Sequence, residues 1–133
     1  MATIDVAAGL IFHQGKLLIA QRFPGAHLGG FWEFPGGKVE PGETFGECLA
    51  REIREELAIE VKVLEEVTEV THEYPGKSVH LRFFRCAFLT GDLKAIGCAA
   101  FAWIQRQELA DYQFPGADLE IIGLLSQRSE WWT

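Results

Sequence analysis

Apolar and polar positions in the first part of the chain follow a pattern that predicts strands. The apolar residues of Ile4–Phe12 and Leu17–Ala20 flank the turn-like sequence His13-Gln14-Gly15-Lys16, which indicates a β-hairpin. A Gly-rich loop follows and leads into a short apolar segment, Phe31–Phe34, which ends at Pro35. The chain is therefore expected to open with a hairpin and a short third strand.

The stretch Thr44–Leu57 carries the clearest helical pattern. Thr44 and Glu47 have the Thr-x-x-Glu spacing of a capping box, in which two side chains satisfy free backbone N–H groups at a helix start. An apolar side chain recurs every four residues, and the resulting stripe consists of Phe45, Leu49, Ile53 and Leu57. We expect an amphipathic helix that buries this stripe.

The second half of the chain adds strands and a second helix. Val61–Val70 and Val79–Leu89 read as strands joined across the turn sequence Tyr74-Pro75-Gly76-Lys77. Ala99–Ile104 is expected to be a short strand, and Leu119–Leu125 the apolar part of a helix. Strands that enclose one helix and precede another imply an α/β fold, a mixed β-sheet sandwiched between helices in α/β/α layers.

Composition and charge narrow the classes of function. The length and a hydrophobic content of 48% fit one globular domain over residues 1–133. No apolar run is long enough to cross a bilayer, and the N-terminus lacks the basic region of a signal peptide. Cys48, Cys86 and Cys98 form neither an even disulfide set nor a metal-ligand spacing, so we expect reduced thiols in a cytoplasmic protein. A net charge of −7 disfavours a nucleic acid polymer as partner, but a small polyanion can bind through divalent cations.

Three carboxylates of the predicted helix share one side of it. Glu52, Glu55 and Glu56 are spaced i, i+3 and i+4, and Glu56 falls at the edge of the apolar stripe. Like charges at the margin of a core need a counter-charge, and hard oxygen ligands suit Mg²⁺ or Mn²⁺. The alternative is an ordinary solvated helix face, in which Arg51 pairs with Glu55.

The wider sequence around these carboxylates favours the metal site. The run from Gly37, GKVEPGETFGECLAREIREELAI, resembles the Nudix box, Gly-x5-Glu-x7-Arg-Glu-apolar-x-Glu-Glu-x-Gly-apolar. The matching positions are Gly37, Glu43, Arg51, Glu52, Ile53, Glu55, Glu56 and Ile59. One position departs from the pattern, since Ala58 stands where the family usually has a Gly that ends the helix in a left-handed conformation. We expect Ala58 to cost about 1 kcal/mol or to shift the cap.

The resemblance implies a role for each of these positions. Glu52, Glu55 and Glu56 are expected to hold Mg²⁺ or Mn²⁺, joined by the backbone carbonyl of Gly36. Arg51 and Glu43 are expected to brace the loop and helix. Glu52 is the first choice for the base that accepts a proton from the attacking water.

A later loop lacks a carboxylate that many relatives carry a few residues before a Trp. Here the stretch from Ala95 to Trp103 has no Asp or Glu, and Gly97 stands roughly where the Glu is expected. This strengthens Glu52 as the base and predicts that activity is low.

Beyond the box, the chain resembles MutT-like nucleoside triphosphate pyrophosphohydrolases along nearly its whole length. Arg22 matches a position that contacts substrate phosphate in that group, and His27 lies in its mobile loop. The structural alternatives are a solvated strand end for Arg22 and an ordinary surface loop for His27.

The base-reading segment of those enzymes is similar to the stretch around Asp118. An ionised Asp only accepts hydrogen bonds, whereas the Asn often found there also donates, so the recognised base edge is expected to differ. The alternative is that Asp118 caps the last helix. Phe34, Phe83 and Phe114 are candidates to stack on a base, and each is also a candidate core residue.

The leading hypothesis is therefore hydrolysis of a nucleoside triphosphate to monophosphate and pyrophosphate, in a monomer or homodimer. Removal of 8-oxo-dGTP from the nucleotide pool is the first expected substrate choice, and CTP or 5-methyl-dCTP the second. ADP-ribose or nucleotide-sugar cleavage, or a binding module of the same fold with weakened catalysis, are the remaining alternatives.

Overall fold

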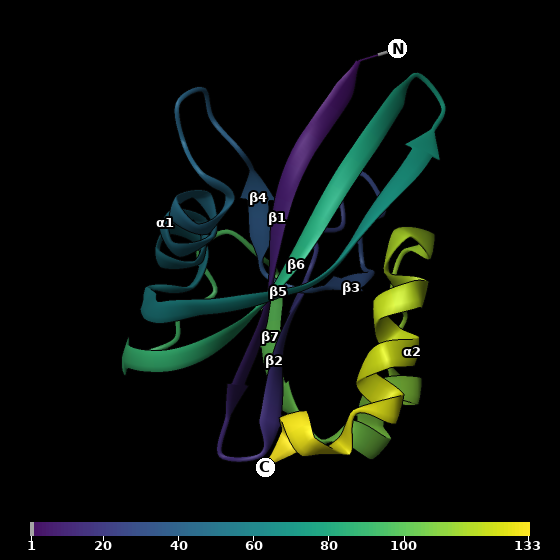
Figure 1. Ribbon diagram of the computed structural model, residues 1–133. Helices are drawn as coiled ribbons and strands as arrows, with labels where there is room; N and C mark the ends of the chain where they lie inside the picture. Colours follow the sequence, from purple (N-terminus) through teal and green to yellow (C-terminus); the bar gives the residue numbers. More distant parts are fainter. Residues whose placement is uncertain (1) are drawn as a thin grey trace.

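The computed structural model describes residues 2–133 as a mixed seven-stranded sheet with a helix on each side (Figure 1). The strands are β1 (Thr3–His13), β2 (Lys16–Gln21), β3 (Trp32–Glu33), β4 (Gly36–Lys38), β5 (Ile59–Tyr74), β6 (Lys77–Gly91) and β7 (Ala100–Ile104). The α-helices are α1 (Phe45–Leu57) and α2 (Leu119–Gln127), and the short 3₁₀ helices are η1 (Arg106–Asp111), η2 (Gly116–Asp118) and η3 (Ser129–Trp132). Neither α-helix in this part of the chain is long and apolar enough to cross a membrane.

The sheet follows the order β3-β2-β1-β6-β5, with β4 added to β1 and β7 added to β2. Strands β1 and β6 pair in parallel, from Thr3 opposite Ser78 to Phe12 opposite Ala87, whereas β1 pairs antiparallel with β2 and with β4. Because parallel strands need a long crossover between them, the whole segment from β2 to β5 lies between β1 and β6 in the sequence. The sheet is therefore mixed, as predicted.

Each face of the sheet has its own hydrophobic core. One core contains Leu49, Ile53 and Leu57 of α1. The other contains Ile121 and Leu125 of α2. The two helices lie on opposite sides of the sheet in Figure 1, which confirms the predicted α/β/α layers.

The bounds of α1 agree with the helix predicted from its capping box and its apolar stripe. The Thr44 hydroxyl accepts a hydrogen bond from the Glu47 backbone N–H at 3.0 Å, and the Glu47 carboxylate accepts one from the Thr44 N–H at 2.9 Å. The predicted capping box is thus confirmed, and the apolar stripe of α1 is buried as expected.

Strands β5 and β6 are longer than predicted. They continue past Val70 to Tyr74 and start again at Lys77, where the residues are mostly polar and partly exposed. Alternating apolar residues mark the part of a strand that is buried, whereas backbone pairing between strands does not require burial. The pattern therefore underestimates the length of strands whose ends project from the core as a hairpin.

The helix α1 ends where predicted despite the missing Gly. Ala58 adopts φ 60° and ψ 30°, the left-handed conformation, and its N–H donates to the Arg54 carbonyl. The cap is therefore not shifted, and the steric cost of a Cβ in this conformation remains in the folded state.

Ala58→Gly is therefore expected to raise the free energy of unfolding by about 0.5–1 kcal/mol, measured by urea denaturation. Ala50→Gly, in the middle of α1, is the matched control and is expected to lower it by about 1 kcal/mol. A loss of stability in Ala58→Gly would contradict the left-handed cap.

Candidate active site

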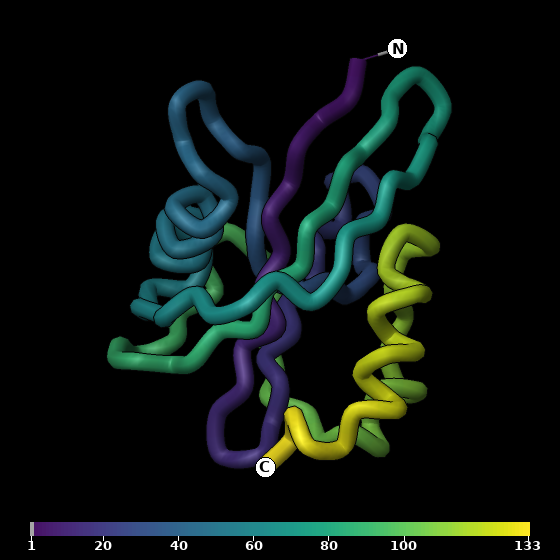
Figure 2. Tube along the Cα trace, viewed as in Figure 1, coloured from purple at the N-terminus to yellow at the C-terminus, as the bar shows by residue number. Residues whose placement is uncertain are grey.

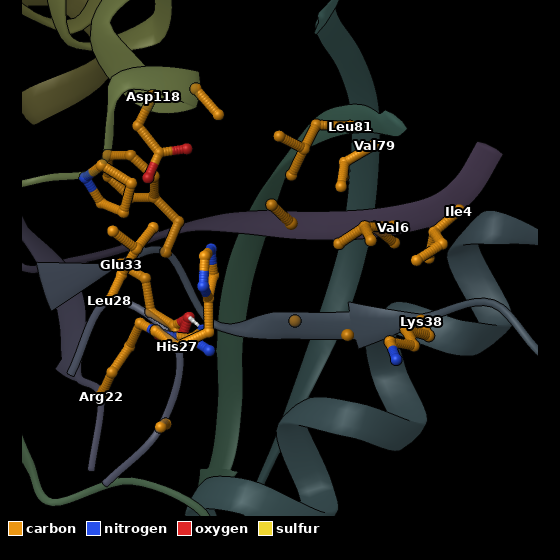
Figure 3. Close-up of a pocket in the computed structure, with 18 of the residues that line it drawn as sticks. Ile4, Val6, Arg22, His27, Leu28, Glu33, Lys38, Val79, Leu81 and Asp118 are labelled. Atoms are coloured by element: carbon orange, nitrogen blue, oxygen red, sulfur yellow. Dashed lines mark hydrogen bonds and ion pairs between the residues drawn. The ribbon is translucent and has the colours of Figure 1, made fainter. Parts of the chain in front are cut away.

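A pocket of about 360 Å³ lies beside the first strands of the sheet (Figure 3). Charged side chains, among them Arg22, Glu33 and Asp118, gather at one end of it. The other end has an apolar wall of Ile4 and Val6 from β1 with Val79 and Leu81 from β6, and Lys38 lies beside it. An apolar wall with a few convergent polar groups is the usual character of a small-molecule site.

The pocket brings together candidate residues from distant parts of the sequence. Its lining includes the candidates Arg22, His27, Phe34, Gly36, Glu56 and Asp118. The candidates that do not line it are Glu43, Arg51, Glu52, Glu55, Phe83 and Phe114. The first four of these lie in or next to α1 and are linked to one another.

Arg51 joins the loop before α1 to the carboxylates of the helix. Its Nε donates to Glu43 Oε2 at 2.7 Å, and its Nη1 donates to Glu52 Oε1 at 3.0 Å and to Glu55 Oε1 at 2.8 Å. Its Nη2 also donates to the Lys38 carbonyl at 3.3 Å. The hydrogen bonds from Arg51 lower the pKa of Glu43 to about 2, so Glu43 stays ionised at neutral pH. This geometry ties the loop to the helix.

Gly36 and Gly37 allow β4 to approach both the sheet and the helix. A Cβ on Gly37 would collide with the Glu52 carboxylate, and a Cβ on Gly36 would collide with the backbone of Ala7. The two glycines therefore place the β4 backbone directly against β1 on one side and Glu52 on the other.

Glu56 is a partly buried carboxylate surrounded by negative charge. Burial raises its pKa to about 9, and the charges of Glu33 and Glu52 add to the effect, while a hydrogen bond from the Gly36 backbone opposes it. Within residues 2–133 no Lys or Arg forms an ion pair with Glu56. Such a group is stabilised in its ionised form by a cation.

The carboxylates match the donor chemistry of a hard divalent cation. In the part of the chain that the structure describes, no three His, Cys, Asp or Glu side chains already lie in a metal-ligand arrangement. Arg51 supplies the positive charge for Glu52 and Glu55 in this conformation. The crowded carboxylate of Glu56, without a cationic partner, is the feature that fits a metal ion.

Asp118 is buried at the charged end of the pocket. Burial raises its pKa to about 7, with a further increase from the charge of Glu33 and a smaller opposing effect of Arg22. Its side chain makes no capping hydrogen bond to α2, because Asp118 itself belongs to η2, which runs directly into that helix. Asp118 thus stands at the N-cap position of α2, but its side chain does not make the capping hydrogen bond that the alternative prediction expected.

Of the three candidate stacking residues, only Phe34 lines the pocket. The Phe34 ring stacks on Phe114 at 5.2 Å between centroids and meets the edge of Phe83 at 6.1 Å. Phe83 is completely buried, so it has no surface to offer a base. Phe83 thus packs behind Phe34, which corrects its candidacy to stack on a base. Phe114 is partly exposed and stacks on Phe34, although it does not line the pocket.

Glu33 and Tyr74 are pocket residues that the sequence reasoning missed. Glu33 pairs with Arg22 at 2.7 Å, and burial raises its pKa. A charged residue inside the apolar segment Phe31–Phe34 was the available signal for it. Tyr74 lies at the end of β5, where its ring meets the exposed His27 at 5.3 Å. No local pattern marks Tyr74, since the contact depends on how the hairpin packs.

Comparison with known proteins agrees with this fold. The family model for the NUDIX domain matches residues 7–124. The chain is 38% identical over 122 residues to the CTP pyrophosphohydrolase of Escherichia coli, covering 92% of this chain and 90% of that protein. It is 43% identical over 82 residues to the 8-oxo-dGTP diphosphatase of Proteus vulgaris, covering 61% and 73%. The solution structure of the E. coli ORF135 protein superimposes with a TM-score of 0.84 at 36% identity, over 96% of this chain and 91% of that chain.

A mixed sheet between two helices, with a carboxylate-bearing helix beside the pocket, defines a Nudix hydrolase, and the chain belongs to this family. Within the family it is a MutT-like nucleoside triphosphate pyrophosphohydrolase, a nucleoside triphosphate diphosphatase. Members of the family generally use a divalent metal ion.

Proposed function

We propose that the enzyme hydrolyses a cytidine nucleoside triphosphate, such as CTP or 5-methyl-dCTP, to the monophosphate and pyrophosphate. The observation that carries the proposal is the position of Asp118, which is buried in the pocket and has a raised pKa. Support also comes from the identity with a CTP pyrophosphohydrolase along nearly the whole chain.

A carboxyl group with a pKa of about 7 exists in two forms near neutral pH. The protonated form donates one hydrogen bond and accepts another. Cytosine offers the complementary pair, since its N3 accepts and its N4 amino group donates. A protonated Asp118 therefore matches cytosine with two hydrogen bonds, and an ionised Asp118 keeps only the one from N4.

The remaining site residues supply the chemistry in this proposal. Glu52, Glu55, Glu56 and the Gly36 carbonyl hold Mg²⁺ or Mn²⁺, which when bound neutralises phosphate charge and lowers the pKa of a water molecule. Glu52 accepts the proton of the attacking water, and Arg51 holds the Glu52 side chain in place. Arg22 has an Nη2 group with no hydrogen bond within residues 2–133, and this group donates to a phosphate oxygen.

The second candidate is 8-oxo-dGTP, which the sequence alone placed first. The specific observation in its favour is the 43% identity with the Proteus vulgaris diphosphatase. That match covers 61% of this chain, whereas the match to the CTP pyrophosphohydrolase covers 92%. The buried Asp118 in place of an Asn further favours the cytidine nucleotide. In either case the enzyme acts on the free nucleotide pool of the cytoplasm; with 5-methyl-dCTP or 8-oxo-dGTP as substrate, removal of the modified nucleotide protects newly made DNA.

Pyrophosphate and phosphate release, with Mg²⁺ and with chelator, tests the proposal. The panel contains CTP, 5-methyl-dCTP, dGTP, 8-oxo-dGTP, ADP-ribose and a nucleotide sugar. We expect metal-dependent pyrophosphate release, with kcat/KM for a cytidine nucleotide about tenfold or more above that for the guanine nucleotides. A preference for 8-oxo-dGTP would select the second candidate. If the folded protein hydrolyses none of these compounds, the proposal is wrong and the chain is a binding module of the same fold with weakened catalysis.

A further inference from the structure

The connection between β6 and β7 packs directly against Glu56, and it leaves no room for a side chain at Gly97. A Cβ on Gly97 would lie 2.8 Å from Glu56 Cγ and 3.2 Å from both Cα and Cβ of the same residue. Real side chains essentially never approach as closely as the first of these distances. The Glu56 Cγ would have to move, which turns the side chain away from its present direction, and Cα and Cβ would have to shift by a few tenths of an ångström.

Backbone hydrogen bonds hold the connection in this position. The N–H groups of Ile96 and Gly97 both donate to the Glu56 carbonyl at 3.0 Å, and the Lys94 N–H donates to the Leu57 carbonyl at 3.0 Å. Further along, the Ala99 N–H donates to the Gln21 carbonyl at 2.8 Å. Figure 2 shows the connection, in green, passing the end of α1. It is thus tied both to the end of α1 and to β2.

Glu56 is consequently confined between two backbone segments. Gly97 lies against its Cβ and Cγ, and the Gly36 backbone donates a hydrogen bond to its carboxylate. Gly36, Glu56 and Gly97 all line the pocket. The direction of the Glu56 carboxylate therefore depends on the absence of a side chain at position 97.

We propose that Gly97 is a positioning residue, which directs the Glu56 carboxylate toward the cation and the substrate. The inference rests on the proposed role of Glu56 as a metal ligand. The proposal also accounts for the carboxylate that this connection lacks. With this backbone, a Glu at position 97 would displace Glu56, as any other side chain there would.

Two variants and a control test the proposal. Gly97→Ala and Gly97→Glu are each expected to weaken Mn²⁺ binding, measured without nucleotide by electron spin resonance, by about tenfold or more. The value of kcat is expected to fall by a similar factor, with KM for the nucleotide within about threefold. Ala95→Glu is the matched control, because it adds a carboxylate at an exposed position of the same connection, and it is expected to change neither quantity. An increase in kcat for Gly97→Glu, or unchanged Mn²⁺ affinity for Gly97→Ala, would overturn the proposal.

A double-mutant cycle separates this role from a general structural one. In a Glu56→Gln background, Gly97→Ala is expected to cause no further loss of Mn²⁺ affinity, because both changes act through the same carboxylate. An additional loss equal to that in the parent protein would show that Gly97 acts elsewhere. Unfolding in chelator identifies any variant that fails to fold. If Gly97→Ala does not fold, Glu56→Ala is introduced beside it, which removes the Glu56 Cγ that the new Cβ would meet, and the double variant is expected to fold. A double variant that also fails to fold would overturn the proposal. If Glu56→Gln alone leaves Mn²⁺ binding intact, the proposed metal site is wrong and the role of Gly97 fails with it. If only the Gly97 variants leave binding intact, the metal site stands and the role of Gly97 alone is wrong.

Discussion

Glu56→Gln is expected to lower kcat by about 100- to 1000-fold while making the metal-free protein more stable. The loss of activity follows from the proposed role of Glu56, because removing one charged ligand takes away several kcal/mol of transition-state stabilisation. The gain in stability follows from its surroundings, because Gln carries no charge to bury beside Glu33 and Glu52.

The gain in stability has a definite pH dependence. The pKa of Glu56 is about 9 in the folded protein and near 4.5 in the unfolded chain, so between these values the folded state holds the additional proton. Stability of the unsubstituted protein therefore falls as the pH rises from about 4.5 to about 9. Glu56→Gln removes this decline, so in chelator at pH 8 its free energy of unfolding should exceed that of the parent by several kcal/mol, since each pH unit above about 4.5 contributes about 1.4 kcal/mol. Near pH 4.5 the difference should disappear.

Urea denaturation in chelator at the two pH values, together with kcat in Mg²⁺, measures both effects. Glu55→Gln is the control for stability, because the Glu55 side chain is half-exposed and shares Arg51 with Glu52. Its free energy of unfolding in chelator should fall between the two pH values as that of the parent does, because Glu56 is retained. Undiminished turnover in Glu56→Gln would remove Glu56 from the metal site.

Asp118→Asn is expected to abolish a pH dependence of base preference. In the unsubstituted enzyme, the ratio of kcat/KM for dCTP to that for dGTP should fall as the pH rises through about 7. The reason is that the ionised carboxylate loses the donor used for cytosine N3 but can accept from both N1 and N2 of guanine. Taking the ratio cancels any pH dependence that the two hydrolysis reactions share.

In Asp118→Asn the amide donates and accepts at every pH, so the ratio should stay constant from pH 5.5 to pH 8.5 within about twofold. The groups that face Asp118 are Glu33, Arg22 and Tyr74, and none of them is changed by this substitution. Asp111→Asn, at an exposed position of η1, is the control and should retain the parental profile. If Asp118→Asn kept the pH dependence of this ratio seen in the parent enzyme, a residue other than Asp118 would select the base.

The parts of the fold that the sequence predicted correctly are those that depend on near neighbours in the chain. The capping box at Thr44 and Glu47 and the hairpin turn between Phe12 and Leu17 involve residues a few positions apart. Each is determined by local hydrogen bonding and by the periodicity of apolar residues. Tyr74 became a pocket residue only through tertiary packing, so no local pattern could identify it.

The site was predicted less completely for the same reason. The resemblance to the Nudix box identified the carboxylates of α1, but it could not show that Arg51 holds Glu52 and Glu55 together. Phe83 illustrates the opposite error, since an aromatic residue looks the same in sequence whether it faces a ligand or the core. Its position in the middle of β6, between the sheet and Phe34, decides the matter.

The parallel pairing of β1 with β6 also affects the order in which the enzyme can fold. Thr3 pairs with Ser78 and Phe12 pairs with Ala87. The long segment between β1 and β6 therefore has to close as a loop before the two strands can pair. Strand β4, which carries Gly36 and Gly37, pairs with β1 as well. Contacts between such distant residues are slow to form, so the catalytic loop and helix should become ordered late during folding. In a chain still being synthesised, before β6 is available to pair with β1, the Nudix box would therefore be incompletely folded and inactive.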